Sequence, residues 1–289
     1  MEIFKIVFNT WQFNLGMFLF FGVISNQYFK LAVKNTSKEN ISTIIMQIVA
    51  GASVLIFVPF FAFKFPSDPK IYLLLLLGSI FYAFGDRTQV TVRKNLEVSV
   101  YSILGQMVKV FLVLYGILVF KEEIIATKLI GGGLILLGNI LIFYQKGKLK
   151  LNRYALLSFA TSFFCATGMI IDVSISKNFN FPFYIMLTFI VPGFFIYLVR
   201  RFSFSELKTE FNSSRKKYYL ITGVSWGFLA FFVIRALQLA DVAFVAPLTA
   251  VIVLLNVMVA SIFHKEKKDL FKKIIAALII IGGAFLIVA

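Results

Sequence analysis

A lysine in the middle of an apolar segment is the residue of this chain with the clearest chemical potential. Lys109 lies in the run SILGQMVKVFLVLYG, too far from either end of an apolar span for its stem to reach water. Gln106 precedes it by three residues, on the same face of the expected helix. This pair predicts a site for an anionic or carboxylate group, or a lysine that titrates to couple proton movement. The structural alternative is a lysine neutralised by burial or paired with a carboxylate.

Four further ionisable residues are expected inside apolar spans, where a charge is costly and usually functional. They are Asp86, Arg87, Asp172 and Arg235. Each is a candidate either for coupling an ion to movement of a solute or for an ion pair that only stabilises the fold. Asp172 is the strongest candidate to bind a cation or to pair with Lys109.

Four uncharged side chains complete the predicted site. Tyr82 and Trp226 each fall near the middle of a span, where two rings would flank a substrate by stacking or cation–π contact. With 17% aromatic residues in the chain, chance is the competing explanation. Asn14 and Asn256 are predicted to orient a substrate by hydrogen bonding, or else to tie helices together.

The elements that hold these residues are predicted to be transmembrane helices. The chain is 60% hydrophobic, with 36 phenylalanines, whereas a soluble domain is nearer ~45–50% apolar. A hydrocarbon layer of ~30 Å requires about 20 helical residues. We therefore expect an all-α integral membrane protein with ten transmembrane helices, at about 11–31, 41–63, 70–91, 98–120, 127–145, 154–174, 181–200, 218–237, 242–263 and 271–289.

The two halves of the chain repeat one another at a fixed spacing. Glu122 and Glu266 stand 144 residues apart, and at this spacing Lys128 corresponds to Lys272 and Gly138 to Gly282. We interpret residues 1–146 and 147–289 as two five-helix repeats. Because five is odd, the second repeat would enter the membrane from the opposite side, which gives two inverted repeats with a substrate site between them near the midplane.

The end of the chain, LADVAFVAPLTAVIVLLNVMVASIFHKEKKDLFKKIIAALIIIGGAFLIVA, resembles the closing helices of the EamA-type transporters of the drug/metabolite transporter (DMT) superfamily. The residues that carry this resemblance are Asp241, Pro247, Glu266, Gly282 and Gly283. In the first half Glu97, Glu122 and Gly138 fit the same pattern, but Ile103 stands where Pro247 stands in the second. The resemblance implies a ten-helix carrier of amino acids, nucleotide sugars, other small metabolites or drugs, without naming the cargo.

Lysine and arginine, 29 against 13 acidic residues, concentrate in alternate loops. By the positive-inside rule this bias places both termini outside, whereas the family resemblance implies termini inside. Because the basic residues are scattered over short loops rather than gathered on one domain face, we do not expect nucleic acid as a partner.

The sequence favours a secondary-active carrier that works by alternating access and moves a small organic metabolite, an amino acid or a related carboxylated or zwitterionic solute. A channel or structural membrane protein is the alternative, and an intramembrane lipid-modifying enzyme is weaker because no HExxH or GxSxG motif occurs. We expect no catalytic residue, cofactor or metal site, with transport driven by protons or by exchange. The predicted partners are the substrate and the lipid bilayer, in a multi-pass protein of the plasma membrane (bacterial inner membrane), with monomer and homodimer both open.

Overall fold

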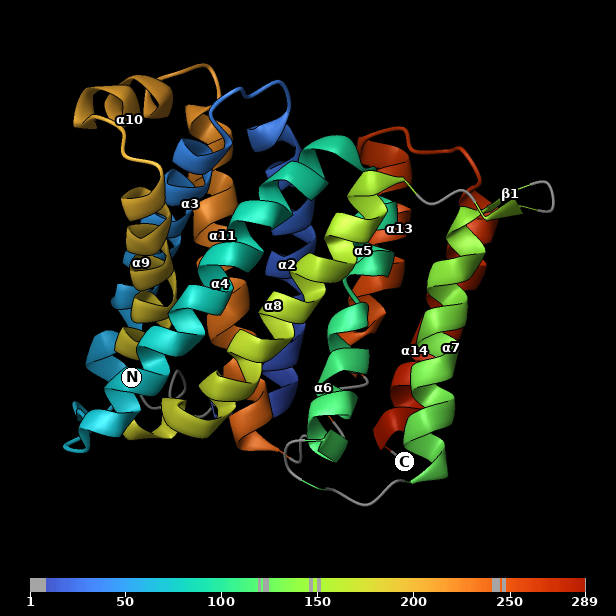
Figure 1. Ribbon diagram of the computed structural model, residues 1–289, viewed down its shortest axis with the longest axis horizontal. Helices are drawn as coiled ribbons and strands as arrows, with labels where there is room; N and C mark the ends of the chain where they lie inside the picture. Colours follow the sequence, from blue (N-terminus) through green and yellow to red (C-terminus); the bar gives the residue numbers. More distant parts are fainter. Residues whose placement is uncertain are drawn as a thin grey trace.

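The computed structural model describes residues 9–118, 121, 125–145, 148–149, 152–240, 245 and 248–288, and these form a bundle of helices (Figure 1). In the first half the helices are α2 (Trp11–Val33), α3 (Glu39–Val54), η1 (Leu55–Phe60), α4 (Pro69–Asn95), α5 (Val98–Leu104), α6 (Met107–Leu118) and α7 (Ala126–Phe143). In the second half they are α8 (Arg153–Ile175), η2 (Ser176–Asn178), α9 (Phe181–Val199), α10 (Phe204–Phe211), α11 (Lys216–Leu239), α13 (Val251–Phe263) and α14 (Leu270–Val288). A hairpin of two short strands, β1 (Tyr144–Gln145) and β2 (Lys148–Leu149), joins the halves.

The helical class and the membrane prediction are confirmed. Among the described residues, nine helical segments are long and apolar enough to cross a membrane. The ninth predicted span, 242–263, contains the shorter helix α13, and residues 242–244 and 246–247 lie outside the described residues. Helix α10, within the connection at 200–217, is an element that we did not predict.

Helix packing follows the 144-residue spacing. Helix α2 packs against α11, and its counterpart α8 packs against α4, the counterpart of α11. Helices α7 and α14, which correspond to one another, pack together, as do α3 and α9. The 144-residue spacing therefore relates each major helix–helix contact to an equivalent contact in the bundle, or to itself.

Glycines permit the closest of these contacts. Gly131 of α7 and Gly283 of α14 face one another so tightly that a Cβ on Gly131 would lie 2.4 Å from the Gly283 oxygen. Gly223 of α11 faces Val49 of α3 at a similarly short distance, 2.5 Å from a built Cβ. Larger residues at these crossings would force the backbones apart, which is why small residues line helix interfaces in membranes.

The predicted span at 98–120 is confirmed over Val98–Tyr115, but a turn divides it into two helices. Helix α5 ends at Leu104 and α6 begins at Met107, with a turn at Gly105–Gln106 between them. The same interruption recurs at the repeat spacing, because Ala250 lies in a turn directly before α13. Two helices of the bundle are thus interrupted at equivalent positions.

Charged residues from the α13–α14 region fix the ends of helices in the first half. Glu266 accepts hydrogen bonds from the backbone N–H of Val98 (2.8 Å) and Ser99 (3.0 Å) and from the Ser99 hydroxyl (2.6 Å). The carboxylate satisfies donors at the start of α5 that have no partner within the helix. Lys272 donates to the carbonyls of Ile142 and Tyr144 at the end of α7. These contacts join the two halves through their repeated charged residues.

Candidate functional site

The interruption of the fourth span places Lys109 in the first turn of α6. Its backbone N–H donates to the Gln106 carbonyl at 3.0 Å, which closes the turn between the two helices. The Lys109 Nζ atom is buried, and no residue that the structure describes hydrogen-bonds it. A buried ammonium is costly unless something pairs with it. The expected pairing of Lys109 with Asp172 is not found, since Asp172 bonds to other side chains.

The geometry around Lys109 favours an anion. The N–H groups of Val108 and Lys109 donate to the carbonyls of the preceding turn, and the helix dipole places partial positive charge at this end of α6. Lys109 adds a buried amine at this positive end of α6. Broken membrane helices in secondary transporters present such N-termini to anionic substrate groups.

Gln106 lies in the turn directly before α6, and its carbonyl accepts the hydrogen bond from the Lys109 N–H three residues later. Its Nε2 atom is 3.4 Å from the Ser102 carbonyl one turn earlier in α5. This interaction of the Gln106 side chain with the chain is therefore local and weak. Gln106 precedes Lys109 by three residues, in the turn between the two helices.

Asp172 of α8 is held by two tyrosines. Tyr82 of α4 donates to Asp172 Oδ2 at 2.7 Å, and Tyr184 of α9 donates to Oδ1. Asp172 is 6% exposed and Tyr184 is fully buried. Tyr82 therefore donates a hydrogen bond to a carboxylate, in addition to the aromatic surface that the sequence predicted. This buried carboxylate joins three helices, α4, α8 and α9.

Trp226, the expected partner of Tyr82, contacts other aromatic rings. Its ring centroid lies 5.7 Å from that of Phe29 and 5.1 Å from that of Phe189, both in edge-to-face geometry. Edge-to-face packing is a favoured arrangement of aromatic side chains in a core. The two positions are equivalent at the repeat spacing, but their contacts differ in kind.

A second buried carboxylate, Asp86 of α4, accepts a hydrogen bond from Gln47 of α3 at 2.7 Å. Asp86 is 5% exposed and Gln47 is fully buried, and the Oε1 atom of Gln47 has no hydrogen-bond partner among the described residues. Farther along α4, the Arg93 guanidinium lies between the rings of Phe29 (4.3 Å) and Tyr101 (4.0 Å). Aspartate and arginine of α4 thus both have polar or aromatic partners inside the bundle.

The two predicted asparagines tie helices or turns together. Asn256 of α13 accepts from Gln27 of α2 at 3.3 Å, and its Nδ2 atom has no hydrogen-bond partner among the residues described. Asn14 donates to the Thr10 carbonyl at 2.8 Å, one turn earlier. Both asparagines are fully buried. Asn256 therefore retains a donor inside the bundle that no described residue engages.

The two arginines predicted as ion-pair candidates behave differently. Arg235 of α11 donates to Asn9 at 2.7 Å and to Gln238 at 3.3 Å, and lies over the ring of Phe61. Arg87 lines a groove between α4 and α9 on the outside of the bundle. Within the described part of the chain, neither arginine forms an ion pair with a carboxylate.

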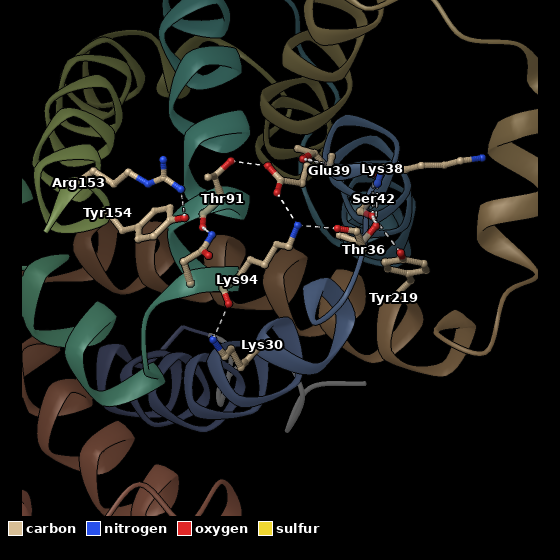
Figure 2. A network of polar contacts seen from close by, with 12 residues as sticks. Lys30, Thr36, Lys38, Glu39, Ser42, Thr91, Lys94, Arg153, Tyr154 and Tyr219 are labelled. Carbon is tan, nitrogen blue, oxygen red and sulfur yellow. Dashed lines mark hydrogen bonds and ion pairs between the residues drawn. The ribbon is translucent and has the colours of Figure 1, made fainter. Parts of the chain in front are cut away.

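A polar network at one end of the bundle joins α2, α3 and α4 (Figure 2). Lys94 donates to Glu39 at 3.0 Å and to the Thr36 carbonyl at 2.7 Å, while Thr91 donates to the other oxygen of Glu39. Lys30 donates to the Lys94 and Leu96 carbonyls, where α4 ends. These hydrogen bonds connect α2, α3 and α4 at that end of the bundle.

At the same end, Arg215, Glu210 and Tyr219 join α10 to α11. Arg215 donates to Glu210, and Tyr219 donates to the same carboxylate at 2.6 Å. Partial burial lowers the pKa of Arg215, but the hydrogen bonds to Glu210 and Tyr219 outweigh this effect, and the pKa lies above its ordinary value. The α10 connection is therefore anchored to the bundle.

The predicted site did not include Gln47, Arg93 or Tyr184, and Glu266 was named only for the repeat and the family resemblance. Gln47 carried a signal, as a polar residue within the apolar span 41–63. Glu266 carried another, as half of the repeated Lys-Glu pair. Arg93 was assigned to a loop, whereas α4 continues to Asn95. In the described part of the chain, no group of three or more His, Cys, Asp or Glu side chains is placed to hold a metal ion.

Comparison with known proteins supplies three findings. Residues 152–289 match the model of the EamA-like transporter family. A solved structure described only as a crystal structure of a protein resembles the chain with a TM-score of 0.63 at 12% identity, covering 94% of this chain and 95% of that one. At this identity the likeness concerns the fold alone. No curated protein sequence matches the chain.

Proposed function

The chain belongs to the EamA-like transporter family of the DMT superfamily and is a multi-pass membrane transporter; on that premise we propose that it is a secondary-active carrier of a small carboxylated or zwitterionic solute. The observation that carries the proposal is the buried amine of Lys109 at the start of a broken helix, without a hydrogen-bond partner among the described residues. A carboxylate bound there would pair with the amine and would be stabilised by the positive end of the α6 dipole.

The carrier works by alternating access between two inverted five-helix repeats, residues 1–146 and 147–289. Two features support this arrangement: the equivalent helix pairs, and the equivalent interruptions at Gly105–Gln106 and Ala250. Two similar halves with opposite orientation have two arrangements of similar energy, one open to each side. Lys109 lies beside the interruption, where a small change of backbone exposes it to water.

Asp172 and Asp86 are the candidate coupling groups. Both carboxylates are buried, and within the described residues both bond to uncharged donors rather than to cations. Burial disfavours the charged form of a carboxylate, so protonation stabilises a buried carboxylate that has no cationic partner. A proton taken up on one side and released on the other would drive the solute, while substrate exchange requires no such group.

The basic loops suggest the orientation. The connections at 34–38, 200–215 and 264–269, together with strand β1, all lie at the upper edge of the bundle in Figure 1, where α10 is drawn. The positive-inside rule assigns this edge to the cytoplasm of a plasma membrane, which for a bacterium is the inner membrane, with both termini outside. A reporter fused after Ala289 that is active only in the cytoplasm would reverse this assignment.

The test is solute exchange in liposomes that contain the purified protein. A panel of radiolabelled amino acids and carboxylates is offered outside, with each unlabelled solute loaded inside. We expect trans-stimulated uptake of at least one carboxylated solute, and its loss to background in Lys109→Met. The matched control Lys177→Met removes an exposed lysine of η2 and should retain uptake.

Two results would contradict the proposal. One is uptake by Lys109→Met at the rate of the unmodified protein. The other is uptake that never depends on internal solute and never saturates, since this behaviour is that of a channel. Size-exclusion profiles in detergent establish that each variant is folded before its uptake is compared.

A further inference from the structure

An apolar groove runs along the outside of the bundle between α4 and α9. Its volume is about 260 Å³, and it is lined by Ile80, Phe84 and Arg87 of α4 and by Leu198, Val199 and Arg200 at the end of α9, among others. Phe84 is 51% exposed and Val199 is 71% exposed. The groove therefore opens toward the surroundings of the bundle and not into its core.

A more polar pocket continues from the end of this groove. It has a volume of about 420 Å³ and lies between the α2–α3 connection and the end of α9. Lys38, Glu39, Arg200 and Arg201 contribute its charges, and it shares Val199 and Arg200 with the groove. The two hollows form one surface that is apolar at one end and basic at the other.

The basic groups of this surface have no partners of their own. In the described residues, no ion pair or side-chain hydrogen bond engages the charged ends of Lys38, Arg87, Arg200 or Arg201. The acidic residue in the pocket, Glu39, already accepts from Lys94 and Thr91. In Figure 2 the Lys38 side chain extends away from that network. The surface thus carries uncompensated positive charge.

The order of residues along α4 matches the layers of a membrane. Leu73, Leu77, Ile80 and Phe84 recur at helical spacing, each at least 39% exposed, and Arg87 follows as the next residue of this stripe. An exposed apolar stripe of a membrane helix faces acyl chains, and an arginine near the end of a span lies at headgroup level. Helix α10 lies across this end of the bundle, with Phe204 at its start 80% exposed (Figure 1).

We propose that this surface binds one anionic phospholipid, with an acyl chain in the α4–α9 groove and the headgroup phosphate among Arg87, Arg200, Arg201 and Lys38. Positive pockets beside membrane helices attract anionic headgroups, and arginine binds phosphate through two parallel hydrogen bonds. A soluble phosphate compound would use the pocket but not the groove. The lipid would tie the ends of α4 and α9 to the α2–α3 connection.

The test is native mass spectrometry of the full-length protein in detergent, with added dioleoyl phosphatidylglycerol or dioleoyl phosphatidylcholine. We expect one phosphatidylglycerol to be retained and phosphatidylcholine to be lost. Arg87→Gln/Arg200→Gln should lower the retained fraction at least tenfold. The control Lys267→Gln/Lys268→Gln removes two exposed charges from the α13–α14 connection and should retain the lipid.

Three outcomes would overturn the inference. They are equal retention of both lipids, equal loss in both double variants, and displacement of the lipid by millimolar inorganic phosphate or glycerol 3-phosphate, which would identify a site for soluble anions. If the double variant does not fold, Arg200→Gln takes its place, because Arg200 is exposed after the end of α9. The melting curve of the double variant in detergent shows whether it is folded, and so whether Arg200→Gln is used in its place.

Discussion

Compared position by position, the first half of the chain carries charges inside its helices where the second half carries apolar side chains. At the 144-residue spacing, Asp86, Arg87, Arg93 and Lys109 correspond to Ala230, Phe231, Leu237 and Val253. The helix pairs and the interruptions are equivalent, and Phe231 and Val253 are fully buried. The comparison separates two roles of the sequence. The repeated residues specify packing, and the residues that differ supply the buried charged groups, with Asp86 and Lys109 in the first half and Asp172 in the second.

The largest effect on stability is expected at the repeated glutamates. Replacement of Glu266 by Ala leaves the Val98 and Ser99 N–H groups without their acceptor and should lower the free energy of unfolding by about 2–4 kcal/mol. Glu122→Ala should act in the same direction if the repeat extends to this cap; Glu122 lies outside the described residues. Melting of the purified variants in detergent measures both.

The control for these glutamates is Glu206→Ala, at an exposed helix cap on α10, which should cost less than about 1 kcal/mol. Unchanged melting of Glu266→Ala would contradict the capping role. A large effect of Glu266→Ala with none from Glu122→Ala would show that only one of the two repeated glutamates caps a helix.

An intermediate effect is expected at the repeated glycines. Gly138 and Gly282 are equivalent in sequence, but a Cβ at Gly138 would lie 2.6 Å from Ile280 and 3.0 Å from the Ala276 carbonyl, while nothing lies within 4 Å of one at Gly282. Gly138→Leu should therefore destabilise the protein by about 1–3 kcal/mol. Gly282→Leu should change its stability by less than about 0.5 kcal/mol. Equal melting temperatures for the two variants would contradict the difference in packing.

The smallest effects are expected at Tyr82 and Trp226. Tyr82→Phe removes a donor to the buried Asp172 and should cost about 1–2 kcal/mol. Trp226→Phe keeps an aromatic ring against Phe29 and Phe189 and should cost about 1 kcal/mol or less. Chemical unfolding in detergent with parallel uptake assays compares them. A greater loss of uptake in Trp226→Phe than in Tyr82→Phe would restore Trp226 to the substrate site.

Much of the architecture could be predicted from hydropathy and from the repeat, because both depend on residues close in sequence or at one fixed spacing. The ten predicted spans overlap the observed helices, and the buried Lys109 was found by its isolation in an apolar run. The interruption at Gly105–Gln106 was missed because the flanking residues remain apolar. The capping box of α10, Ser203 with Glu206, was available as a signal but was not used.

The pairings inside the bundle could not be predicted in this way. Asp172 meets Tyr82 and Tyr184 from two other helices, and Asp86 meets Gln47 from a third, so both depend on how the helices rotate against each other. The repeat predicts which helices pack but not which side chains meet. For this reason the sequence offered Asp172 as a candidate to bind a cation or to pair with Lys109, and the structure shows it hydrogen-bonded to two tyrosines.

The most direct test of the carrier proposal is the access of water to position 109. In a Cys165→Ser background, which removes the single cysteine, the Lys109→Cys variant is treated in liposomes with a charged thiol reagent that does not cross membranes. We predict that the thiol introduced at this position reacts in the folded protein, because alternating access exposes position 109 to water in one of the two states of the carrier. A thiol that reacts only after denaturation would contradict the proposal, since position 109 would then be sealed in an apolar core.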